Sequence, residues 1–247
     1  MSPICDYAGY DYKKAFWDNQ GREYEDECER QTLVRLLHQI DRPIGTLLDI
    51  GCGFGRLFDT YQPFANAFVL LDYAQHLLDQ AKRDIVTQKP IRFVQGNMTA
   101  MPLDTSSVDV AITVRTLHHL ENVETLFAEV YRVLSADGVF IFEIPNQRHL
   151  LNITRFFLGK LSQNPFSKTP IRVNQSFLNY HPGFILDLLS GHGFEVKTSV
   201  NTSFFRSAWI KSRIKACYLC GLDHIFQRLF SWANLTPSVV VMAIKKG

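Results

Sequence analysis

The chain has little net charge and no long apolar run. Its 26 lysines and arginines nearly balance 24 acidic residues, which leaves a formal net charge of +2. Surfaces that follow nucleic-acid phosphates normally make a domain markedly basic, so no nucleic-acid partner is expected. No apolar stretch is long enough to cross a bilayer, and the residues after Met1 lack the pattern of a cleaved leader. We therefore expect a cytoplasmic protein.

Cysteines are few and scattered. Five occur, at positions 5, 28, 52, 217 and 220, and this odd set is a poor framework for disulfides, so reduced thiols are expected. Cys217 and Cys220 form one CxxC pair, but a structural zinc site needs four ligands and no second pair lies nearby. We expect the pair to lie on one helix face and predict no metal site.

Short apolar runs alternate with amphipathic segments along most of the chain. Helices are expected over 24–40 and 56–61, and again between the later strands. The alternation predicts an α/β, Rossmann-like doubly wound sheet, mostly parallel with an antiparallel last strand and with helical cap insertions. The expected strands are 46–50, 67–71, 91–94, 108–114, 139–144, 194–200 and 238–244.

A glycine-rich turn follows the first expected strand. Gly51, Gly53 and Gly55 stand where an open α/β sheet has its ligand crevice. A dinucleotide fingerprint would have Gly or Ala in place of Arg56, and a P-loop would continue with Lys-Ser or Lys-Thr. Asp49, just before the turn, would repel a pyrophosphate but suits a cationic ligand. Nicotinamide, flavin and nucleoside triphosphate sites are therefore disfavoured.

Residues 47–55, Leu-Leu-Asp-Ile-Gly-Cys-Gly-Phe-Gly, resemble the first motif of the class I S-adenosylmethionine-dependent methyltransferases. The likeness, to the type 11-like small-molecule group, covers about residues 49–144. It implies S-adenosyl-L-methionine as cofactor, with Asp49 and the glycine turn at its methionine end. Asp72, at the end of the second strand, would accept hydrogen bonds from the ribose hydroxyls. The other residues assigned to the cofactor are Tyr73, Asn97, which stands where the family more often carries Asp, Met98 and Arg115.

Two histidines follow the fourth expected strand. Methyl transfer from a sulfonium takes its reactivity from the cofactor, so the protein chiefly orients the acceptor. If the acceptor is a hydroxyl, a neutral histidine suits the role of base, which makes His118 and His119 the catalytic candidates. The alternative for both is an ordinary role in lining the pocket or capping the next helix.

Three segments fall outside the sheet pattern. Residues 1–45 are expected to form an N-terminal helical lid, since aromatics gather at Tyr10, Tyr12, Phe16, Trp17 and Tyr24; a surface helix is the alternative. Segments 146–175 and 204–232 are expected to cap the acceptor. The second has the pattern of two helices, 209–221 and 222–230, and its basic amphipathic character leaves a peripheral membrane contact open. The walls expected for the acceptor include Phe156, Phe157, Phe166, Phe204, Phe205 and Trp209.

Together these features predict one methyltransferase domain over 1–247. It would transfer a methyl group from S-adenosyl-L-methionine to a small metabolite, and the aromatic insertions are compatible with a lipophilic one. The accepting atom (O, N or C) and the oligomeric state stay open. The alternative is a catalytically silent S-adenosylmethionine-binding or scaffold module, because a fold does not fix an activity.

Overall fold

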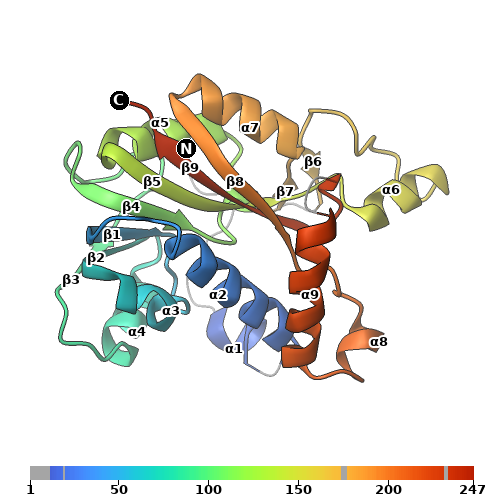
Figure 1. The fold of residues 1–247 in the computed structure, drawn as a ribbon, viewed down its shortest axis with the longest axis horizontal. Helices are drawn as coiled ribbons and strands as arrows, with labels where there is room; N and C mark the ends of the chain where they lie inside the picture. Colours follow the sequence, from blue (N-terminus) through green and yellow to red (C-terminus); the bar gives the residue numbers. More distant parts are fainter. Residues whose placement is uncertain (1–11, 19, 174–176, 231–232) are drawn as a thin grey trace.

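A twisted sheet runs through the centre of the computed structural model, which describes residues 12–18, 20–173, 177–230 and 233–247 (Figure 1). The strand order is β3-β2-β1-β4-β5-β9-β8, and β9 runs in the opposite direction to the other strands of this sheet. The mostly parallel sheet with an antiparallel last strand is thus confirmed. Its strands are β1 (Ile44–Ile50), β2 (Ala65–Asp72), β3 (Ile91–Gln95), β4 (Val108–Thr113), β5 (Leu134–Pro145), β8 (Phe194–Thr202) and β9 (Ser238–Lys245).

Helices cover both faces of the sheet, because its central strands are apolar on both sides. One face carries α2 (Glu23–Leu37), α3 (Phe58–Tyr61) and α4 (Gln75–Asp84), and the other carries α5 (Val123–Val133) and α7 (Pro182–Gly191). The remaining elements are α1 (Tyr12–Phe16), α6 (Leu150–Phe157), α8 (Ala208–Lys211), α9 (Ala216–Phe230), the short ribbon β6 (Ile171–Arg172) with β7 (Leu178–Asn179), and 3-10 turns at Gln62–Phe64 and Leu117–His119.

The strand order reverses between β1 and β4. From β1 the chain proceeds outward through β2 and β3, and it then returns to the other side of β1 to build β4 and β5. Ligands of open α/β sheets bind beyond the carboxyl ends of the strands at such a reversal. The turn after β1 is fixed there, since the backbone N–H groups of Gly51 and Cys52 donate to Leu71 O of β2 at 2.7 and 3.1 Å.

Two predicted helices differ from the structure. The helix expected over 56–61 is only the single turn α3, because Pro63 has no N–H for the next helical bond. In the second insertion the helix break falls at 212–215, before α9, and not near Gly221. Gly221 is exposed, so it destabilises the helix only through the low helix propensity of glycine. Leu219 and Cys220 beside it are buried against α2, and this packing stabilises the helix across the glycine.

Helix α9 packs against α2, at the side of the sheet (Figure 1). Tyr24 Oη donates to Asp223 Oδ1 at 2.7 Å, and the Sγ atoms of Cys28 and Cys220 lie 3.3 Å apart. The side chains of Trp209 and Tyr218, in the predicted cap, are 65% and 68% exposed and take no part in this packing. The CxxC pair is divided by this packing: Cys217 is exposed and Cys220 is buried.

Two kinds of feature are missing from the part of the chain that the structure describes. No helix there has both the length and the apolar character needed to cross a membrane. Within the same residues, no three histidine, cysteine or acidic side chains gather in a way that could hold a metal ion.

Candidate active site

The glycine turn adopts a backbone that favours glycine. Gly51, Gly53 and Gly55 have φ angles of +73°, +56° and +78°. A Cβ on Gly51 would lie 2.9 Å from the Thr116 side chain, and one on Gly55 would lie 2.7 Å from Ile85 Cδ1. A Cβ on Gly53 would meet no atom within 4 Å. The turn is therefore packed at its two ends and open in its middle.

Asp49 brings a buried carboxyl group to the end of β1. Its Oδ2 accepts a hydrogen bond from Tyr61 Oη at 2.8 Å, and it has no ion pair among the described residues. Burial raises the pKa of Asp49 to about 7, although the Tyr61 hydrogen bond opposes this shift. A cation bound beside Asp49 would favour the ionised form.

Asp72 occupies the corresponding place at the end of β2. Its Oδ2 accepts from Gly53 N at 2.7 Å and its Oδ1 from Ala74 N at 2.9 Å, while burial raises its pKa. Each oxygen keeps a lone pair for a ligand hydroxyl. The cavity beside it measures about 80 Å³. Its lining includes Gly51, Gly53, Asp72, Tyr73, Met98, Arg115, Thr116 and His119.

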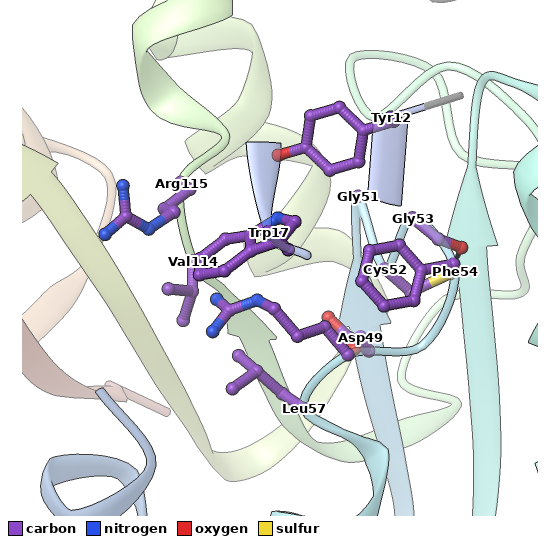
Figure 2. Close-up of a pocket in the computed structure, with 11 residues that line it drawn as sticks. Tyr12, Trp17, Asp49, Gly51, Cys52, Gly53, Phe54, Leu57, Val114 and Arg115 are labelled. Carbon is purple, nitrogen blue, oxygen red and sulfur yellow. Dashed lines mark hydrogen bonds between the residues drawn. The ribbon is translucent and has the colours of Figure 1, made fainter. Parts of the chain in front are cut away.

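The N-terminal segment lies over the glycine turn (Figure 2). The ring of Trp17 is 3.9 Å from the Arg56 guanidinium carbon and 5.1 Å from that of Arg115. Beneath this stack, the buried Glu29 carboxylate accepts from Arg56 Nη2 and Arg115 Nε, both at 2.7 Å. A cavity of about 50 Å³ remains between Trp17, Tyr12 and the turn.

A third cavity, of about 280 Å³, opens beyond the ends of β4 and β5 and the start of β9. Tyr12 and Arg115 line all three cavities, so the three adjoin one another. The other residues lining the third are Phe16, Arg22, His118, Glu143, Pro145, Asn146, His149, Val173, Phe177, Asn179, Arg206, Pro237 and Ser238.

Most of the predicted site residues converge on these cavities. Asp49, Asp72 and Arg115 join Gly51, Gly53, Tyr73, Met98 and His119 around the two smaller cavities, and His118 faces the largest. Two predicted residues do not line them. Gly55 packs against the Ile85 side chain, behind the turn. Asn97 Oδ1 accepts from Thr99 N at 3.0 Å and Thr99 Oγ1 at 2.9 Å, which engages the atom expected to contact an adenine.

The six aromatic side chains predicted as acceptor walls do not line the third cavity. Phe157, Phe166 and Trp209 are exposed, and the ring centroid of Phe205 lies 5.3 Å from that of Phe226. The insertions contribute other residues to this cavity, such as His149, Val173 and Arg206. Some parts of the predicted lid and caps lie outside the described residues, namely 1–11 with Tyr10, 174–175 and 231–232.

Sequence reasoning found Arg115 but missed the other charged residues of the third cavity. Arg22 falls in the segment expected to form a lid or a surface helix and Arg206 in the second insertion, neither with an assigned role, and Glu143 and His149 were not singled out. Arg206 lies between β8 and α8, in a stretch without helical or strand periodicity, so no local pattern indicated that its side chain turns inward.

The segment that forms most of this site is similar in sequence to known methyltransferases. Residues 48–142 match the family model described as "Methyltransferase domain". A Mycolicibacterium smegmatis protein described as a probable S-adenosylmethionine-dependent methyltransferase is 27% identical over 155 residues, which are 62% of this chain and 53% of that protein. The sterol 24-C-methyltransferase of Pneumocystis carinii is 26% identical over 147 residues, 56% of this chain and 38% of that enzyme. The chain thus spans about half of these curated relatives or less.

A solved structure agrees over nearly the whole chain. Magnesium protoporphyrin IX methyltransferase from Synechocystis, solved with bound S-adenosylhomocysteine, matches with a TM-score of 0.62 and 14% identity. The match covers 95% of this chain and 92% of that one. At this identity the likeness is one of fold, and both chains share the mostly parallel sheet.

Proposed function

We propose that this chain, which carries a class I S-adenosylmethionine-dependent methyltransferase domain, transfers a methyl group from that cofactor to a small-molecule acceptor. The observation that carries the proposal is the group of three adjoining cavities at the strand reversal. The two small ones beside the glycine turn form the cofactor side, one lined by Asp49 and the other by Asp72, and the third, the acceptor cavity, is lined by His118 and charged side chains. Arg115 stands between them.

The residues on the cofactor side fit S-adenosyl-L-methionine. Its sulfonium and amino groups are cationic and would be attracted by Asp49, while Asp72 would accept from the ribose hydroxyls. The open middle of the turn at Gly53 lets a ligand approach the backbone closely. Tyr73 and Met98 would flank the adenosine. The bound cofactor supplies the activated methyl group, and these residues orient it toward the acceptor cavity.

Residues 12–18 would act as the lid over this cofactor. Binding sites for small molecules usually enclose roughly 300–1,000 Å³. The cavities beside the turn measure about 50 and 80 Å³. Tyr12 and Trp17 must therefore shift for the cofactor to enter, and they would pack over it afterwards.

His118 would act on the acceptor. Burial, His119 and Arg115 hold the pKa of His118 well below its ordinary 6.5, so the imidazole is neutral at neutral pH. A neutral ring on the acceptor cavity can take the proton of a hydroxyl acceptor. His119 lines the adenosine side, and we assign it to cofactor contact there.

The names of similar proteins include both small-molecule and protein acceptors, since an eEF1A lysine and N-terminal methyltransferase is among them, and we favour a small acceptor because of the third cavity. By their names, one acts on a sterol and another on magnesium protoporphyrin IX. The alternative of a silent binding module has no support in the site, which has both a cofactor cavity and an acceptor cavity. Peripheral membrane contact through 204–232 stays a prediction; Trp209, Tyr218, Ile225 and Leu229 are exposed there.

A labelled-methyl screen tests the proposal. The protein is incubated with isotopically methyl-labelled S-adenosyl-L-methionine and metabolite extracts, and labelled products are identified by mass spectrometry. We expect at least one labelled small molecule that depends on His118 or Arg115. Cofactor binding without any labelled product would favour the silent module. Tighter binding of NADH than of S-adenosyl-L-methionine in calorimetry would contradict the cofactor itself.

A further inference from the structure

The acceptor cavity carries an excess of positive charge. Three guanidinium groups face it, those of Arg22, Arg115 and Arg206, against the single carboxylate of Glu143. Its two histidines add no charge at neutral pH. Burial and Arg206 lower the pKa of His149 to about 4, and His118 is held low as described above.

Arg115 and Glu143 already have partners. Arg115 Nε donates to Glu29 Oε1 at 2.7 Å. Glu143 Oε2 accepts from Arg115 N at 2.8 Å, and its Oε1 accepts from the Ser238 hydroxyl. Arg115 and Glu143 are thus engaged with other groups, and neither forms an ion pair with Arg22 or Arg206 among the described residues.

Arg206 is half-buried and incompletely paired. Its Nη2 donates to Ser238 Oγ at 2.6 Å, while its Nε is shielded from solvent without a hydrogen-bond partner. No ion pair of Arg206 occurs among the described residues. Burial and then Arg115 lower the pKa of Arg206, and the carboxylates of Glu143, Glu29 and Glu25 only partly oppose this lowering.

Arg22, like Arg206, lacks an ion pair among the described residues. Its guanidinium lies 5.4 Å from the Phe16 ring and 5.9 Å from the Trp17 ring, and it makes no ion pair or side-chain hydrogen bond within the described part of the chain. Burial and Arg115 lower its pKa as well. Burying unpaired charge is unfavourable, whereas a bound anion would turn both arginines into charge-assisted hydrogen-bond donors.

We infer that the methyl acceptor is an anion, with a carboxylate or phosphate group held by Arg206 and Arg22 and an apolar body packed against Phe16 and Phe177. This substrate class rests on the proposed function. The cofactor's own carboxylate does not explain the two arginines. Both line only the acceptor cavity, whereas Gly51 and Gly53 line the other two. Guanidinium groups suit such oxyanions because they donate two parallel hydrogen bonds.

The test uses three small probes on the protein saturated with S-adenosylhomocysteine. Benzoate, phenyl phosphate and benzamide share an aromatic body, and only the first two are anions. Calorimetric titration is expected to show binding of at least one anion and at least tenfold weaker binding of benzamide. The anion that binds more tightly identifies the group. Binding of benzamide as tight as that of both anions would overturn the inference.

Arg206→Gln is the decisive variant. We expect it to weaken binding of the preferred anion roughly tenfold to a hundredfold, the range for lost hydrogen bonds to a charged group. The dissociation constant for S-adenosylhomocysteine should stay within about twofold, since that ligand uses other contacts. The matched control is Arg213→Gln, because Arg213 is exposed in the same insertion. Arg22→Gln serves if Arg206→Gln does not fold.

Two results would contradict the subsite directly: anion binding unchanged in both the Arg206 and the Arg22 variants, or anions that compete with S-adenosylhomocysteine. The same titrations without S-adenosylhomocysteine separate this inference from the proposed function. If the protein does not bind S-adenosylhomocysteine but retains anion binding that depends on Arg206, the proposed function alone fails.

Discussion

The two sides of the strand reversal carry opposite charge. On the cofactor side, Arg56 and Arg115 are paired with Glu29, while the buried carboxyl groups of Asp49 and Asp72 form no ion pair within the part of the chain that the structure describes. On the acceptor side the excess is cationic. A cationic methyl donor and an anionic acceptor would each find complementary charge in adjoining chambers, and neither would be well placed in the other's chamber.

The two sides also differ in how the chain builds them. The cofactor side comes chiefly from the ends of three consecutive strands and the turns that follow them, between residues 49 and 98. The acceptor side takes residues from 12–22, 115–118, 143–149, 173–179, 206 and 237–238. One side is therefore a local property of the sequence, and the other exists only once the whole chain has folded.

Glu29 connects the two sides, because it forms ion pairs with Arg56 on the cofactor side and with Arg115, which lines both. Its substitution should have the largest effect on stability of the variants considered. Its side chain is 2% exposed and binds both Arg56 and Arg115. Glu29→Gln leaves the largely buried Arg115 without its ion pair and Arg56 with Asp26 as its remaining acidic partner, so we expect the free energy of unfolding to fall by about 3–5 kcal/mol in chemical denaturation. Glu23→Gln, at an exposed position of the same helix, is the control and should change it by less than about 0.5 kcal/mol. Equal free energies of unfolding for the two variants would mean that the ion pairs of Glu29 do not contribute to stability.

The effect of Glu29 depends on pH in a defined direction. Burial raises its pKa, but Arg115 and then Arg56 outweigh burial and hold the pKa below the ordinary 4.5. Its contribution to stability is therefore complete above that value and is lost as the pH falls toward the lower pKa of the folded state. The difference in the free energy of unfolding between the wild type and Glu29→Gln should therefore decrease only at acidic pH.

Asp72→Ala tests the cofactor side alone. Removing a charged acceptor of two ribose hydroxyls should weaken S-adenosyl-L-methionine binding roughly tenfold to a hundredfold in calorimetry. Anion binding in the acceptor cavity should stay within about twofold. Asp79→Ala, on the exposed side of α4, is the control. An equal loss for both ligands would contradict the division into two sides.

Asp49 should make cofactor binding depend on pH. Its pKa of about 7 in the folded protein means that a cationic ligand must displace a proton below that pH. Affinity for S-adenosyl-L-methionine should rise with pH, by at most about tenfold per unit, and level off above 7. Asp49→Asn should abolish the slope. In the absence of cofactor the raised pKa favours the folded state at low pH, so Asp49 should diminish stability as the pH rises from about 4 to 7.

Trp209→Ala should have the smallest effect. Its side chain is 65% exposed and lines none of the three cavities, so both ligand affinities should stay within about twofold and stability within about 0.5 kcal/mol. The measurements are the same titrations and denaturation curves. A selective loss of acceptor binding would extend the acceptor side to the tip of the second insertion.

The sheet and the cofactor side could be predicted because their signals are local. The run before Gly51, the glycines with positive φ and the acid at the end of the next strand each follow from short-range rules. Asn97 shows the limit even here. Its position was expected from the motif, but its side-chain oxygen closes a turn with Thr99, and a pattern of residue types does not reveal such a choice.

The acceptor side could not be predicted because its geometry is tertiary. The chain before Arg206 is held by Asp223, a fully buried carboxylate that accepts from Ser203 N at 3.2 Å, Phe204 N at 2.8 Å and Tyr24 Oη at 2.7 Å. These groups are about 20 and 199 residues away from Asp223 in the sequence. No periodicity connects them, so the inward direction of Arg206 appears only in the folded protein.

The stacking of Trp17 on Arg56 makes Trp17 a fluorescent reporter of the proposed lid, residues 12–18. An indole held 3.9 Å from a guanidinium and shielded at its Nε1 emits in surroundings unlike those of the exposed Trp209. When the cofactor enters beneath it, that stack must separate, and the emission maximum and intensity of Trp17 change with it. The chain has three tryptophans, so Trp209→Phe combined with Trp232→Phe leaves Trp17 as the only one. In that background, stopped-flow fluorescence can follow the movement of residues 12–18, and the dependence of its rate on cofactor concentration distinguishes opening before binding from opening after it.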